Sequence, residues 1–172
     1  DKLARPMYPA IAGDCLRRGA HVWFEKPPAA SCAEIEALRE AERASGRHAM
    51  AGLKKMFFPA NEKARELMNA PDFGRPSLMT LQYPMRVPEA DRIARYLREG
   101  EERGPVRGFL DHLCHPVSLM LFLAGMPDTL YYDRAASGAG TAIFSFASGL
   151  LATLHFTGGA SNNGGMERTM IV

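Results

Sequence analysis

Long hydrophobic runs are missing from this 172-residue sequence, and none approaches the roughly 20 apolar residues that a membrane-spanning helix needs. An excess of one charge is missing too, because 21 Lys and Arg are interspersed with 19 Asp and Glu for a formal net charge of +2. A nucleic-acid groove needs a concentrated basic stripe, and a signal peptide needs an apolar segment near the start. The sequence therefore predicts neither a membrane nor a nucleic-acid partner.

Cysteine is scarce as well. The three cysteines, Cys15, Cys32 and Cys114, are odd in number and far apart, which indicates free thiols rather than a disulfide framework. Free thiols are typical of a reducing compartment, so we expect a cytoplasmic protein. With 47% hydrophobic and 23% charged residues, the composition is typical of a soluble globular protein and not of a disordered one.

The first fifty residues alternate between helical and strand-like patterns. Helices are predicted over 9–19 and 31–46, and short buried strands over 21–24 and 48–52. The second helix begins with a capping box in which Ser31 and Glu34 accept hydrogen bonds from backbone N–H groups. Helix, strand, helix, strand is the order of a parallel α/β sheet.

After Gly52 the pattern changes, so we predict a domain boundary near Gly52–Leu53. The predicted helices cover 59–68, 89–98 and 109–123, and the predicted strands cover 77–83, 128–136, 141–147, 150–157 and 167–172. Pro116 either kinks the last helix or marks its first turn. Several strands that follow a helix predict an antiparallel α+β sheet, in which Ser148-Gly149 forms a tight hairpin. The predicted class is therefore α/β plus α+β.

The first chemical motif is Gly19-Ala20-His21-Val22-Trp23-Phe24-Glu25-Lys26-Pro27. A Lys at the end of a parallel strand lies at the sheet edge where open α/β sheets bind ligands. Its ammonium can hydrogen-bond a hydroxyl and, if desolvated, exchange a proton near neutral pH. Pro27 can hold a cis bond that fixes the direction of Lys26. The alternative is a solvated lysine next to a turn.

The second motif places Asp111 and His115 one helical turn apart on the same face. An Asp beside a His favours a basic imidazole, which suits proton removal from a hydroxyl. The alternative is structural: an Asp favoured by the helix dipole and a His satisfied by a neighbour. A metal site would add Cys114, but this side chain points about 100° of helical turn away from His115. We predict no metal.

Together with a third motif, these stretches resemble the Gfo/Idh/MocA family (glucose–fructose oxidoreductase and inositol dehydrogenase). The family pattern G-K-H-V-x-x-E-K-P matches Gly19–Pro27, with Ala20 in place of Lys. The pattern G-F-x-R-R-F-x-P-A matches Gly52–Ala60, and D-x-x-x-H matches Asp111 and His115. Three motifs in the family order are more specific than any one of them, and the resemblance spans essentially the whole chain.

The resemblance implies that the chain is an internal piece of such an enzyme. Residues 1–52 would be the second half of a Rossmann domain that binds NAD or NADP. Residues 53–172 would be an α+β substrate and oligomerisation domain, incomplete at its C-terminus. This domain would be an antiparallel open-faced sheet with helices on one side, through which the full-length protein forms a homo-oligomer.

The implied reaction is hydride transfer between NAD(P) and a sugar- or polyol-like hydroxyl or carbonyl. Lys26 would lie beside the cofactor and the substrate, His115 would be the acid/base, and Asp111 would orient His115 or hold a substrate hydroxyl. We therefore expect Lys26 and His115 to face one cleft. The resemblance also implies that Glu25 and Pro27 shape the cofactor edge.

Several positions depart from the family pattern. No G-x-G-x-x-G turn is present, and the one glycine-rich stretch, 158–165, lies late in the chain. Met56, Ser118 and Tyr8 replace an Arg, an Asp and a His of the family, which leaves the substrate class open. Lys55, in the second motif of the chain, is a further candidate for a substrate contact.

Two other functions stay open at this point. One is a related enzyme that uses NAD as a cycling cofactor for elimination or hydrolysis, and the other is a non-catalytic binding or assembly module. We expect the piece alone to be inactive. We also expect Val22, Phe24 and Met50 to flank an exposed, unpaired sheet edge.

Overall fold

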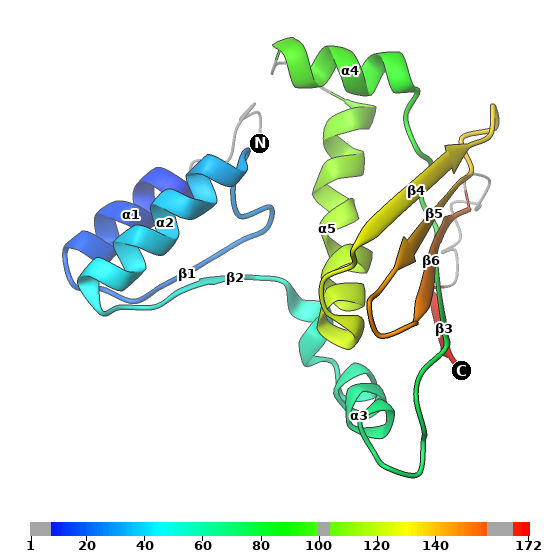
Figure 1. Ribbon diagram of the computed structural model, residues 1–172. Coiled ribbons are helices and arrows are strands. Elements are labelled where there is room, and N and C mark those ends of the chain that lie inside the picture. The colour runs from blue at the N-terminus through cyan, green and yellow to red at the C-terminus, as the bar shows by residue number, and fades with distance from the viewer. Residues whose placement is uncertain (1–7, 100–103, 158–166) are drawn as a thin grey trace. The chain divides into compact units, whose positions relative to one another are not determined.

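The chain divides into two compact units. The structure is a computed structural model that describes residues 8–99, 104–157 and 167–172, so the glycine-rich stretch 158–165 lies outside the described residues. The described part of the first unit is 8–53, and the second unit begins at Lys54 (Figure 1). Among the described residues, none of the helices combines the length and the apolar composition that crossing a bilayer requires.

The first unit has the predicted order of helix, strand, helix, strand. Its elements are α1 (Tyr8–Arg17), β1 (Val22–Phe24), α2 (Cys32–Ser45) and β2 (Ala49–Ala51). The two strands pair in parallel, with Trp23 opposite Met50. Both helices cover one face of this pair (Figure 1), and their core consists of Ala12, Leu16 and Leu38.

The uncovered face of the first unit is apolar. Trp23 is 78% exposed and Met50 is 45% exposed. Val22 and Phe24 instead pack against the helices, because successive side chains of a strand point to opposite faces. Of the three residues expected beside an exposed sheet edge, Met50 is exposed, whereas Val22 and Phe24 face the helices.

Helix α2 has the caps that the sequence predicts. The Ser31 hydroxyl accepts a hydrogen bond from the Glu34 N–H at 3.3 Å, and the Glu34 carboxylate accepts one from the Ala30 N–H at 2.8 Å. Gly46 ends the helix in the left-handed region, with φ of 62°, which costs a glycine little.

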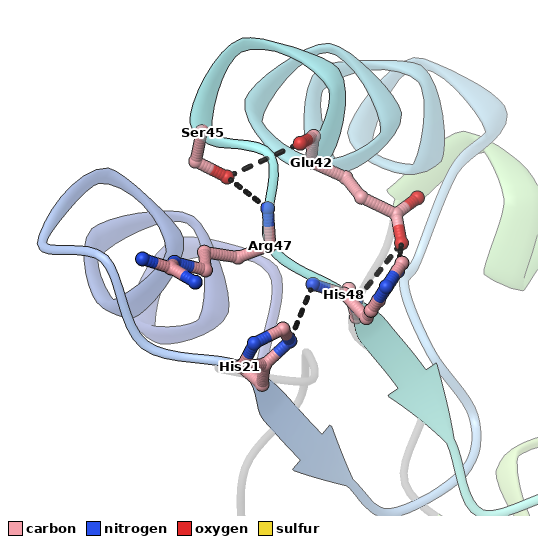
Figure 2. A network of polar contacts seen from close by, with 6 residues as sticks. His21, Glu42, Ser45, Arg47 and His48 are labelled. Carbon is pink, nitrogen blue, oxygen red and sulfur yellow. Dashed lines mark hydrogen bonds and ion pairs between the residues drawn. The ribbon is translucent and has the colours of Figure 1, made fainter.

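A polar network joins the end of α2 to the amino-terminal ends of β1 and β2, as Figure 2 shows. The His48 N–H donates to His21 Nδ1 at 3.0 Å, and the Ala49 N–H donates to Glu42 Oε1 at 3.1 Å. The Arg47 N–H donates to the Ser45 hydroxyl at 3.2 Å. These contacts lie at the edge opposite to the ligand-binding edge of a parallel sheet, so we assign them a structural role.

In the described residues of the second unit there are four helical segments and five strands. They are η1 (Lys54–Phe57), α3 (Pro59–Met68), β3 (Leu78–Tyr83), α4 (Ala90–Glu99), α5 (Pro105–Ala124), β4 (Thr129–Arg134), β5 (Gly140–Ser145), β6 (Leu151–Phe156) and β7 (Arg168–Ile171). The expected helix over 109–123 begins four residues earlier, at Pro105. Proline suits this position because the first turn of a helix does not need the N–H that proline lacks. Pro116 consequently lies inside the helix and not in its first turn.

The five strands form one mixed sheet in the order β4-β5-β6-β3-β7. Three pairs are antiparallel, as predicted, but β3 and β6 run parallel, with Leu81 opposite Leu154. The expectation of a purely antiparallel sheet is therefore wrong at this pair. Two helices and two strands separate β3 from β6 in the sequence, so no local pattern predicts that they pair. The predicted class, helices combined with a sheet, is confirmed.

The core of the second unit lies between α5 and one face of the sheet (Figure 1). Its fully buried side chains include Met79, Met120 and Leu154, and burying one side chain of this size contributes about 1.5–3 kcal/mol. Apolar residues recur along α5 at helical spacing, which directs one stripe of the helix onto the sheet. The core thus fixes the position of α5, which carries the D-x-x-x-H motif.

Candidate functional site

Lys26 lies at the carboxyl end of β1. The strand ends at Phe24, and the Lys26–Pro27 peptide bond is cis. Across from it, the Gly52 N–H donates to the Phe24 carbonyl at 2.8 Å, so the chain leaves β2 beside the Glu25–Pro27 segment. A Cβ at Gly52 would come within 3.6 Å of the Glu25 carboxylate. This is the edge at which parallel sheets bind ligands.

Asp111 and His115 lie near the middle of α5, one turn apart. Both side chains are half-buried. An Asp111 carboxylate oxygen is 3.6 Å from His112 Nδ1, and the rings of His112 and His115 meet edge to face with centroids 6.3 Å apart. Sequence reasoning had given His112 no role, although its position next to Asp111 was visible. The structure thus places one carboxylate and two imidazoles together.

Lys55 is buried within a second polar cluster of the same unit. Its side chain is 8% exposed, and its ammonium forms an ion pair with Glu167. The same ammonium lies 4.9 Å from the centre of the Tyr83 ring, which adds a cation–π contact. The Lys55 carbonyl accepts a hydrogen bond from the Asn61 side chain at 2.7 Å. Lys55 is therefore held from several sides.

Tyr83 links this cluster to the α5 motif. Burial, and after it the electrostatic effects of Glu167, Cys114 and Asp111 in that order, together raise the pKa of Tyr83 to about 12. The phenol consequently stays protonated at any physiological pH and serves only as a neutral donor or acceptor. Neither Tyr83 nor Glu167 was found from the sequence, because a Tyr at a strand end and a Glu before a strand are common surface residues.

The raised pKa of Tyr83 predicts a loss of stability at alkaline pH. The unfolded chain releases the phenol proton near pH 10, whereas the folded chain keeps it up to about pH 12. The contribution of Tyr83 to the free energy of unfolding is thus fully present below pH 10, and it falls by roughly 2–3 kcal/mol as the pH rises to 12. Urea unfolding at pH 9 and pH 11.5 should show a smaller loss for Tyr83→Phe than for the wild type. Equal losses would contradict the assignment.

The described residues suggest no metal centre. Among them, no three His, Cys, Asp or Glu side chains are grouped as metal ligands would be. The Cys114 thiol donates to the Asp111 backbone carbonyl at 3.2 Å, inside its own helix. Cys15, Cys32 and Cys114 are all free thiols.

The predicted site residues therefore fall into two groups. Asp111, His115 and Lys55 belong to the second unit, where Lys55 contacts the Tyr83 ring and Asp111 affects the pKa of Tyr83. Lys26, with its neighbours Glu25 and Pro27, belongs to the first unit. The expected meeting of Lys26 and His115 in one cleft joins residues of both units and stays a prediction.

Three solved structures with the same fold are dehydrogenases by name. A probable dehydrogenase from Thermotoga maritima is 18% identical with a TM-score of 0.75, and the match covers 95% of this chain and 51% of that chain. A putative myo-inositol dehydrogenase from Sinorhizobium meliloti is 18% identical with a TM-score of 0.74, over 95% and 51%.

A third match is the WlbA dehydrogenase from Bordetella pertussis in complex with NADH and UDP-GlcNAcA. It is 18% identical with a TM-score of 0.75, over 96% of this chain and 53% of that chain. The chain thus spans about half the length of the structures it matches. No curated protein matches the sequence significantly.

The family model of the GFO/IDH/MocA C-terminal domain matches residues 61–172, which is more than half of the chain. This segment contains the D-x-x-x-H motif on α5 and the whole five-stranded sheet. The chain belongs to the GFO/IDH/MocA family.

Proposed function

We propose that the chain is part of an NAD(P)-dependent oxidoreductase that transfers hydride between the nicotinamide and a sugar- or polyol-like substrate. The observation that supports this most is the position of Lys26, at the carboxyl end of a parallel strand in a member of this family. The names of the structural neighbours agree, since one was solved with NADH and UDP-GlcNAcA and another with NAD⁺ and L-tartaric acid.

The first unit offers part of a fitting site for NAD or NADP. Glu25, Lys26 and Pro27 follow a parallel strand, and Gly52, just after the neighbouring strand, lies beside Glu25. No G-x-G-x-x-G turn occurs in these 172 residues, so they would supply the nicotinamide side of the site but not its pyrophosphate side. When bound, the nicotinamide would supply the hydride acceptor or donor.

Each proposed catalytic residue has a separate task. In alcohol oxidation, the hydroxyl-bearing carbon would lose its hydrogen as hydride to the oxidised nicotinamide, while His115 would take the proton of the same hydroxyl. The Lys26 ammonium would hold the same hydroxyl by a hydrogen bond and favour its loss of a proton. The Asp111 carboxylate would favour the protonated form of His115 or hold a second substrate hydroxyl.

Lys55 would take part in substrate binding mainly through Glu167, its partner in the ion pair. The ammonium itself is nearly buried, whereas the Glu167 side chain is 49% exposed. A substrate hydroxyl would therefore meet the carboxylate of the pair and the edge of Tyr83 more readily than the ammonium. Paired charges of this kind suit neutral polyhydroxylated molecules, because the pair offers both donors and acceptors.

We further propose that the full-length protein is a homo-oligomer joined through the sheet. The face opposite α5 exposes Leu78, Tyr131, Ile143, Leu151 and Met170. A charge there should dissociate the oligomer, since burying an unpaired ammonium in an interface is unfavourable. Sedimentation should show at least about tenfold weaker association for Ile143→Lys. Leu97→Lys, on α4 and away from the sheet, is the control, and equal effects would contradict the interface.

A cytoplasmic location is proposed as well. It is supported by the three free thiols, which a reducing compartment keeps free. Fractionation of cells that produce the protein should recover it with cytoplasmic markers, and recovery elsewhere would contradict the location.

The proposed reaction can be tested by following the absorbance of the reduced nicotinamide. The enzyme should carry this chain together with a complete dinucleotide-binding fold, and the substrates should be polyols, sugars and sugar acids. Net cofactor reduction that matches the amount of oxidised product supports the proposal. Elimination or hydrolysis without net reduction of the cofactor would favour NAD cycling. If no reaction occurred with any of the substrates, a binding module would be favoured.

A further inference from the structure

Three arginines line one cavity of the second unit that the proposed reaction does not use. The cavity has a volume of about 300 Å³. Arg86 comes from the loop after β3, Arg92 from the first turn of α4, and Arg134 from the end of β4. The rest of the lining is Glu89 and the buried Val87 and Pro88. Three separate segments of the chain thus bring a guanidinium group to the same space.

Arg134 is held in place by the backbone. Its Nε donates to the Val87 carbonyl at 3.1 Å, and its Nη1 donates to the Ala135 carbonyl at 3.0 Å. The third nitrogen, Nη2, has no hydrogen bond to any residue that the structure describes. The guanidinium is therefore fixed in orientation while one of its nitrogens is left for a ligand.

Arg86 occupies space that a side chain at position 138 would fill. A Cβ on Gly138 would lie 2.5 Å from Arg86 Cγ and 2.6 Å from Arg86 Nε. Gly138 has a φ of 88°, which suits glycine, and its carbonyl accepts a hydrogen bond from the Val87 N–H at 2.9 Å. The turn between β4 and β5 thus packs against the Arg86 side chain, in the space that Gly138 leaves open.

The charges in this cavity are not balanced. Three arginines and one glutamate give the lining a net charge of +2, and over the described part of the chain none of the three guanidinium groups is in an ion pair. Like charges that share one site repel each other, so an anion would stabilise the arrangement. One carboxylate can be satisfied by a single bidentate arginine, whereas a phosphoryl dianion has three terminal oxygens and the matching charge of −2.

We propose that Arg86, Arg92 and Arg134 bind a phosphoryl group of a small-molecule ligand. The cavity is large enough for a phosphoryl group and part of the molecule that carries it. This site depends only on residues of the second unit and not on the proposed hydride transfer. It can therefore be tested without any enzymatic assay.

Inorganic phosphate is the probe for the first experiment. Calorimetric titration of the full chain at constant ionic strength should show saturable binding with one site. Arg92→Gln should weaken binding at least about tenfold, because a charge-assisted hydrogen bond is lost. Arg95→Gln is the matched control, since Arg95 is an exposed arginine one turn further along α4 that does not line the cavity, and its effect should stay within about twofold.

Malonate, also a dianion, tests the chemistry of the ligand. Binding of malonate should be weaker than binding of phosphate, and both should weaken as NaCl screens the exposed guanidinium groups. Tighter binding of malonate would replace the phosphoryl assignment by a carboxylate site. Absence of saturation, or equal losses in Arg92→Gln and Arg95→Gln, would mean an adventitious ion only and would overturn the site itself.

Discussion

Lys26→Ala and His115→Ala are each expected to lower turnover by roughly 10²–10⁴-fold, or about 3–5 kcal/mol of transition-state stabilisation. The assay is steady-state hydride transfer in an enzyme that carries this chain and a complete dinucleotide-binding fold. Lys26 and His115 are both half-buried and belong to neither hydrophobic core, so neither substitution should unfold the protein. Circular dichroism and the urea midpoint should confirm that the fold is kept.

Two further substitutions separate the proposed chemistry from its alternatives. Asp111→Asn should cost less than His115→Ala, because the amide still accepts a hydrogen bond but loses the charge that favours imidazolium. Cys114→Ser should have a mild effect on turnover, since the thiol donates a hydrogen bond to a backbone carbonyl of its own helix, which a serine hydroxyl can also do. If Cys114→Ser abolished turnover while Lys26→Ala did not, thiol or metal chemistry would replace the proposed mechanism.

The elements of the fold could be predicted from the sequence because their causes are local. The helix over 59–68 follows from Pro59 at its first turn and from apolar residues at helical spacing, and the structure has it with the same bounds. The end of α2 follows from Gly46, whose left-handed conformation stops the helix. Local signals of this kind lie within a few residues of the feature that they determine.

Contacts between distant segments could not be predicted in this way. The parallel pairing of β3 with β6 joins residues more than seventy positions apart, and both strands alternate in the same manner as their antiparallel neighbours. The candidate site shows the same limit. Asp111 and His115 were found because they are one turn apart, whereas Glu167 reaches Lys55 across 112 positions and carries no motif. The cavity with three arginines is likewise assembled only by the fold.

The pair of Lys55 and Glu167 leads to the second large expected effect. Glu167→Ala removes the ion-pair partner of an ammonium whose side chain is 8% exposed, while the cation–π contact with Tyr83 stays. Removing one partner of a fully buried pair costs about 3–5 kcal/mol, whereas an exposed pair contributes about 0–1 kcal/mol. Because the Glu167 side chain is 49% exposed, we expect an intermediate loss of about 2 kcal/mol in the free energy of unfolding. Urea unfolding at pH 7 measures this loss.

Lys55→Met distinguishes an unpaired buried charge from lost packing. Methionine nearly fills the space of the lysine stem without the charge, so this variant should lose less than about 1 kcal/mol although it removes the same ion pair. The double variant Lys55→Met/Glu167→Ala should be close to Lys55→Met, because Glu167→Ala then leaves no ammonium unpaired. The resulting coupling energy should be about 1–2 kcal/mol. Additive losses in the double variant would show that Glu167 acts through the backbone before β7 and not through Lys55.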